Sequence, residues 1–179
     1  MFHKKLLTMT SLCFLTVLIQ GCGMNKISQY QNNTPILMID DFFAHPVKGY
    51  GMVQKNSGEV RRRFTVSMHG HWTGNNGVLD EHFVYDDGEK QSRQWHLIRQ
   101  DKHHFTATAA DVTGTATGEQ VGNAIHMNYV LQVPYNGKTI DVSMDDWLYR
   151  VDEHVVLNSA VMKKFGIPVG RVTASFFKE

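Results

Sequence analysis

Cysteine is scarce in this chain of 179 residues: Cys13 and Cys22 are the only two. Both lie near the N-terminus, so the remaining sequence contains no thiol that could form a disulfide or a cysteine-based zinc site. The domain that follows must therefore derive its stability from side-chain packing and hydrogen bonds alone.

An excess of charge of one sign is also lacking. The sequence has 18 Lys and Arg residues against 17 Asp and Glu, a formal net charge of +1. Nucleic-acid binding depends on a basic surface that neutralises phosphates. The balance of charges therefore predicts a protein without a nucleic-acid partner.

Long apolar runs and the common catalytic motifs are missing as well. The longest apolar run, residues 12–19, is much shorter than the roughly 20 residues that a transmembrane helix needs. No GxSxG elbow, P-loop or HExxH motif is present. We accordingly predict no cofactor and no metal site.

The N-terminus has the features of an export signal. A basic start, the short apolar run and a small residue before Cys22 predict a signal peptide over residues 1–21. The Gly21-Cys22 pair resembles the lipobox of bacterial lipoproteins, although Gln20 departs from the commonest pattern. The resemblance implies cleavage before Cys22 and acylation of that cysteine, with palmitate as a typical acyl chain. An ordinary secreted protein with an incidental cysteine is the alternative.

This resemblance also implies a location. More than one acyl chain is needed for stable anchoring, and a lipidated Cys22 would supply them. Gly23 follows the cysteine, whereas an aspartate there typically retains lipoproteins at the inner membrane. We expect an outer-membrane anchor with the protein facing the periplasm. The polar residues 22–34 are predicted to form a flexible, lipidated tether to a domain over residues 35–179.

The domain is dominated by strand patterns. Residues 63–72 alternate strictly between apolar and polar side chains, which is typical of a strand with one buried face. Turn sequences such as Asn76-Gly77, Asp86-Asp87-Gly88 and Asn136-Gly137 separate successive strands. About nine antiparallel strands joined by short loops favour an up-and-down barrel, because closure removes exposed edges.

Hairpin geometry predicts which residues face each other inside. The turns place Leu79 opposite Trp95, Glu81 opposite Arg93 and Met127 opposite Asp146. After Asp145 the apolar residues change from even to odd positions, so we predict a β-bulge at residues 145–147. The adjacent carboxylates there suggest an acid–base pair or a cation site only if the bulge turns them to one side.

Several short motifs recur in a familiar order along the chain. They are Phe42-Phe43, Gly49-Tyr50-Gly51, residues 61–66, Gly70-His71-Trp72, Asp86-Asp87-Gly88, Arg93-Gln94-Trp95, Gly122-Asn123-Ala124, Asp145-Asp146-Trp147 and Lys164-Phe165-Gly166. This order resembles an uncharacterised family of Gram-negative lipoproteins, a domain-of-unknown-function family with a lipocalin-like (calycin) β-barrel. The resemblance implies an all-β, antiparallel, up-and-down lipocalin-like barrel of about 8–10 strands. It brings no established activity or catalytic residue.

We therefore predict that the barrel binds a small hydrophobic ligand such as a fatty acid or another lipid. Glu81 and Arg93 would form its polar anchor, with Arg93 holding a carboxylate or phosphate. A self-contained ion pair is the alternative reading of these two residues. The remaining candidate ligand-binding residues face the same interior: Trp72, Phe83, Trp95, Met127, Tyr129, Met144 and Asp146.

Two other functions remain open at this level. One is a lipid-modifying enzyme, or an accessory to one, that uses Asp145, Asp146 or Glu81. The other is an envelope scaffold or assembly protein whose barrel is filled by its own side chains. Outward histidines such as His69 and His71 are interpreted as ordinary exposed residues. The basic residues 61–63, placed near the tether, could touch anionic lipid headgroups.

Overall fold

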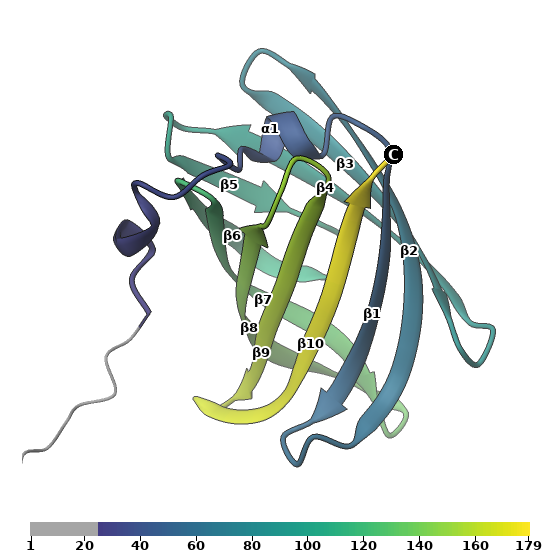
Figure 1. Cartoon of the computed structure of the whole chain (residues 1–179). Helices are drawn as coiled ribbons and strands as arrows, with labels where there is room; N and C mark the ends of the chain where they lie inside the picture. The colour runs from purple at the N-terminus through teal and green to yellow at the C-terminus, as the bar shows by residue number, and fades with distance from the viewer. Residues whose placement is uncertain (1–24) are drawn as a thin grey trace, which may run out of the picture.

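A computed structural model describes residues 25–179, and the predicted signal peptide and the predicted lipidation site Cys22 lie outside this part of the chain. Within it, ten antiparallel strands form one closed barrel (Figure 1). Two four-residue helices, η1 (Ile27–Tyr30) and α1 (Ile39–Phe42), precede the strands. The strands are β1 (Val47–Lys55), β2 (Val60–Thr73), β3 (Asn76–Tyr85), β4 (Lys90–Arg99), β5 (His104–Thr108), β6 (Val112–Val121), β7 (Ala124–Tyr135), β8 (Lys138–Arg150), β9 (Val155–Lys164) and β10 (Ile167–Lys178).

The barrel is a simple meander. Each strand pairs with the next one in the sequence, and β1 pairs with β10 to close the circle. Tight turns make this connectivity possible: Asn136 and Gly137 both have positive φ between β7 and β8, as a type I′ hairpin requires. The predicted all-β, antiparallel, up-and-down barrel is confirmed.

The predicted cross-strand registers are also observed. Leu79 lies opposite Trp95, and Glu81 lies opposite Arg93. Met127 lies opposite Asp146 in the β7–β8 ladder. Side chains alternate between the two faces of a strand, so a shift of one residue would turn each inward side chain to solvent.

Strand β8 differs from its prediction at residues 145–147. The β7–β8 ladder runs without a register shift, so the predicted bulge is wrong. Asp146 and Leu148 continue the inner row and line the interior. Trp147 and Tyr149 instead lie on the outer face of the wall, where they pack with η1.

The segment before the barrel covers this outer aromatic pair. Ile27 is buried against Trp147, and the ring of Tyr30 lies 6.0 Å from that of Trp147 and 5.4 Å from that of Tyr149. A Cβ atom at Gly122 would come within 1.8 Å of the Tyr30 carbonyl oxygen, so the close approach requires glycine. The flexible-tether prediction is therefore corrected for residues 25–34, which dock on the barrel because apolar side chains in this polar stretch find a partner surface.

Helix α1 closes one end of the barrel (Figure 1). Phe42 is fully buried there, and Phe43 is nearly so. The buried guanidinium of Arg150 lies over the Phe42 ring and donates hydrogen bonds to the carbonyl oxygens of Ile36 and Asp152. These contacts join the linker before β1 to the β8–β9 loop, so this end is sealed by side chains. The opposite end carries the β1–β2, β7–β8 and β9–β10 hairpins (Figure 1).

In residues 25–179, neither short helix has the length and apolar character that a membrane span requires.

Candidate functional site

A cavity of about 910 Å³ runs through the barrel interior from α1 to the open end. Its volume lies in the range of small-molecule sites, roughly 300–1,000 Å³. The structure contradicts the alternative of a barrel filled by its own side chains. Eight of the nine predicted ligand-binding residues line this cavity: Glu81, Phe83, Arg93, Trp95, Met127, Tyr129, Met144 and Asp146.

Trp72 is the exception. Its ring lies across Gly70 and Gly77, where an added Cβ would come within about 2.3 Å of the indole. Trp72 is on the inner face, as predicted, but it packs at the end that α1 closes and does not line the cavity. The two glycines leave a flat backbone surface onto which the ring folds, and sequence alternation alone cannot indicate this.

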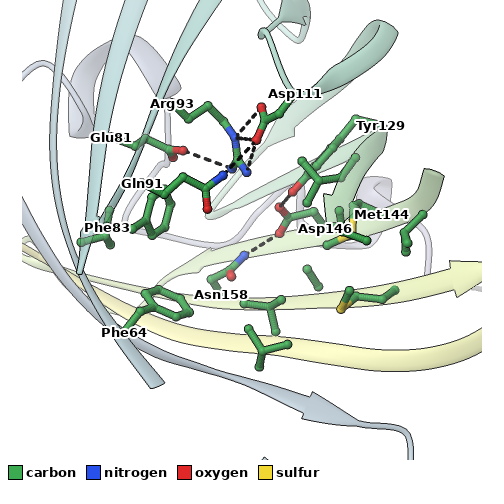
Figure 2. Close-up of a pocket in the computed structure, with 18 of the residues that line it drawn as sticks. Phe64, Glu81, Phe83, Gln91, Arg93, Asp111, Tyr129, Met144, Asp146 and Asn158 are labelled. Atoms are coloured by element: carbon green, nitrogen blue, oxygen red, sulfur yellow. Dashed lines mark hydrogen bonds and ion pairs between the residues drawn. The ribbon is translucent and has the colours of Figure 1, made fainter. Parts of the chain in front are cut away.

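Arg93 is the centre of a polar cluster on the cavity wall (Figure 2). Its Nη1 donates to Glu81 Oε2 at 3.3 Å, as the register predicts. Its Nη2 and Nε donate to the Asp111 carboxylate at 2.9 and 3.0 Å. The Arg93 and Glu81 side chains are only 12% and 13% exposed. Asp111 is the main partner of Arg93, a pairing that the strand pattern of the sequence does not predict.

The Arg93–Asp111 contact bridges a place where backbone pairing has stopped. The β4–β5 ladder covers His96 to Arg99 and does not reach Arg93. Asp111 lies in the short connection between β5 and β6. The ion pair therefore holds these strands together where the wall lacks hydrogen bonds between their main chains. Strand lengths, which define this gap, cannot be read from the alternating pattern.

The electrostatics of this cluster reflect burial and mutual pairing. Burial raises the pKa of Glu81, and the neighbouring Arg93 opposes this only in part. Burial alone would lower the pKa of Arg93, but Glu81 and Asp111 outweigh it and raise that pKa. Arg93 therefore stays charged, and its cationic form is required to keep the carboxylates inside the barrel.

A second polar group surrounds Asp146 (Figure 2). The Tyr129 hydroxyl donates to Asp146 Oδ2 at 3.0 Å, and Asn158 Nδ2 donates to Asp146 Oδ1 at 2.5 Å. Burial raises the pKa of Asp146, and these two hydrogen bonds partly oppose the rise. Burial and the adjacent Asp146 also raise the pKa of Tyr129. Asp146 is thus an enclosed carboxyl group held by uncharged donors.

Asn158 reaches Asp146 because of the length of the β8–β9 turn. A tight Asp152-Glu153 turn would place it opposite Trp147, but the observed partner is Leu148. The β8–β9 turn is one residue longer than such a hairpin, because the Val151 N–H pairs with the carbonyl of Val155. The resulting shift directs Asn158 into the cavity.

Asp145 lies on the outer surface, away from Asp146. It accepts hydrogen bonds from Trp147 Nε1 at 3.0 Å and Lys163 Nζ at 2.8 Å, and contacts the His126 ring. Partial burial would raise the pKa of Asp145, but the bonds from Lys163 and His126 outweigh it and lower that pKa. Because adjacent strand residues face opposite sides, Asp145 and Asp146 cannot act as an acid–base pair on one substrate.

The other polar residues singled out in the sequence form no site. The rings of His69 and His71 contact each other edge-on on the outer face. In residues 25–179, no group of three or more His, Cys, Asp or Glu residues is placed to hold a metal ion. Residues 61–63 start β2 at the open end, whereas η1 contacts β6 and β7 near Gly122 at the other end. Their predicted position near the tether is therefore wrong.

A closed antiparallel barrel with a lined interior cavity and one sealed end defines a lipocalin-like protein. The fold is similar to an S-type phycobiliprotein lyase, CPES, from Guillardia theta: TM-score 0.59, 6% sequence identity, with 80% of this chain and 93% of that chain covered. The chain belongs to the family described as "protein of unknown function (DUF3833)", whose model matches residues 16–178. No curated protein gives a significant sequence match. The resemblance to a domain-of-unknown-function family with a lipocalin-like barrel is confirmed.

Proposed function

We propose that this protein is a lipid-anchored binding protein that holds one small apolar molecule inside its barrel. The observation that carries this proposal is the cavity of about 910 Å³, which one end of the barrel leaves accessible. Its wall combines aromatic, aliphatic and methionine side chains with a few convergent polar groups, the usual composition of a small-molecule site. A lipid is the natural cargo class for such a wall.

The anchor is the second part of the proposal. Acylation of Cys22 would attach the protein to the outer membrane with the barrel in the periplasm. Since residues 25–34 dock on the barrel wall, only three residues, 22–24, separate the proposed lipid from the docked segment. The barrel would therefore be held close to the membrane surface.

Ligand binding is testable by native mass spectrometry. The mature chain, residues 22–179 with Cys22→Ser, is exported behind a cleavable signal peptide and purified from the periplasm without detergent. We expect one bound lipid per protein, released by organic extraction. An empty mass that persists after incubation with mixed membrane lipids would contradict the binding function.

Acylation is testable independently. In the full-length protein with its own signal, Cys22→Ser should abolish metabolic labelling by an alkyne analogue of palmitate, because the acceptor thiol is absent. Cys13→Ser, which changes the other cysteine, should retain full labelling and serves as the matched control. Labelling of the Cys22→Ser protein would show that the lipobox reading is wrong.

A further inference from the structure

The charged groups that line the inner part of the cavity are mostly acidic. Glu81, Asp111 and Asp146 supply three carboxyl groups, and Arg93 supplies one guanidinium. The remaining charged lining residues, which lie toward the open rim, are Lys55, Arg61, Arg62, Glu89 and Lys164. The interior polar groups therefore carry more potential negative than positive charge.

Arg93 has little capacity left for an anionic ligand. All three of its nitrogens already donate to Asp111 or Glu81. Only two of the five N–H groups of its guanidinium remain, so a ligand carboxylate would share that cation with two carboxylates that already neutralise its charge. It would also meet the repulsion of two carboxylates that are already present. The anchor that the sequence predicted for a fatty acid is thus occupied by the protein itself.

Asp146, unlike Glu81 and Asp111, has no cationic hydrogen-bond partner. Its carboxyl group is enclosed, and its hydrogen-bond donors, Tyr129 and Asn158, are uncharged. No salt bridge to Asp146 exists among the described residues, whereas Glu81 and Asp111 both contact Arg93. A buried carboxylate is stable only when a cation or a proton compensates its charge. A protonated amine brought by a ligand would supply that compensation.

Carboxylates offset most of the positive charge at the rim, where Arg61 and Lys164 are the lining cations without a salt bridge among the described residues. Arg62 is paired with Asp87 and Glu89 at 3.2 and 2.9 Å, and Lys55 is paired with Glu59 at 2.6 Å. Aromatic and apolar side chains such as Phe64, Phe83 and Val142 line the way from the rim to Asp146 and suit a hydrocarbon chain.

We infer that the cavity selects an amphiphile whose polar end is an amine, which Asp146 receives in the interior while the hydrocarbon chain extends toward the rim. This inference rests on the proposed binding function and specifies its ligand class. The ammonium would donate hydrogen bonds to the Asp146 carboxylate and replace the proton that burial otherwise favours there.

The test compares three ligands with the same chain and different polar ends: dodecylamine, dodecanol and dodecanoate. Their affinities for the mature Cys22→Ser protein are measured by isothermal titration calorimetry at pH 7, below the micellar range. We expect the amine to bind at least about tenfold more tightly than the alcohol, a difference of about 1.4 kcal/mol, and dodecanoate to bind most weakly. Equal or tighter binding of dodecanol or dodecanoate would overturn the amine inference and leave the binding function intact. Absence of binding by all three would overturn both.

Substitutions on β8 test whether Asp146 is responsible. Asp146→Asn should reduce the ratio of amine to alcohol affinity to about one, because the charge that favours the ammonium is removed. Asp145→Asn removes a carboxylate from the adjacent residue on the outer face and should leave the ratio unchanged. If Asp146→Asn does not fold, Asp146→Ser removes the same charge with a smaller polar side chain and should lower the same ratio. A ratio that stays high in the folded variant would overturn the assignment.

Discussion

Replacement of Arg93 by methionine is expected to lower the free energy of unfolding by about 3–5 kcal/mol at pH 7. Methionine keeps much of the side-chain volume but leaves Glu81 and Asp111 without their common cation. It also removes the contact that joins β4 to the β5–β6 connection. Urea unfolding monitored by tryptophan fluorescence measures the loss.

The destabilisation should depend on pH in a defined direction. Burial already raises the pKa of Glu81, and loss of Arg93 removes the main influence that opposes this rise. A group whose pKa is higher in the folded state than in the unfolded state stabilises the fold when it is protonated. This contribution to the free energy of unfolding is lost as the pH rises through the folded-state pKa. The difference in the free energy of unfolding between the wild-type protein and Arg93→Met should therefore decrease as the pH falls from 7 toward about 4.3, the ordinary pKa of glutamate.

Arg63→Met is the matched control for this experiment. Arg63 also forms an ion pair, with Asp86 at 3.0 Å, but its side chain is 73% exposed. An exposed pair contributes little, so we expect a change below about 1 kcal/mol. Restoration of stability in the triple variant Arg93→Met, Glu81→Gln and Asp111→Asn would confirm that unpaired buried charge causes the loss. Similar losses of unfolding free energy in Arg93→Met and Arg63→Met would contradict this explanation.

Phe42→Ala is expected to cost about 3–5 kcal/mol, because it leaves a cavity at a fully buried site. Phe42 packs edge-on against Phe43, with ring centroids 5.2 Å apart, and lies beneath the Arg150 guanidinium. Its removal should loosen α1 and open the sealed end of the barrel. Thermal unfolding measures the loss, and amide hydrogen exchange across residues 35–46 measures the opening.

Phe165→Ala provides the control for Phe42→Ala. This phenylalanine lies in the β9–β10 turn and is 91% exposed, so its truncation should change stability by less than about 0.5 kcal/mol. A loss below about 1 kcal/mol for Phe42→Ala would show that α1 does not contribute to the barrel core and that our account of the sealed end is wrong.

The amino-acid sequence by itself determines the barrel and most of its interior. Period-two alternation and tight turns specify which side chains face inward and which pairs face each other, because a one-residue slip reverses a strand. Glu81 opposite Arg93 and Met127 opposite Asp146 follow from turn lengths alone. These are local properties, so they can be predicted without knowing the packing.

Only the tertiary structure decides the features that depend on contacts between distant segments. From its apolar ring alone, Trp147 would be expected inside the barrel. The structure instead buries it on the outer wall against η1, which lies more than 100 residues earlier in the chain. Asp111 becomes the main partner of Arg93 because the β4–β5 ladder ends before that residue, and Trp72 leaves the cavity because two glycines accommodate its ring. Whether the barrel is open or filled depends on the summed volumes of side chains from all strands, a property of the closed barrel that no single strand contains.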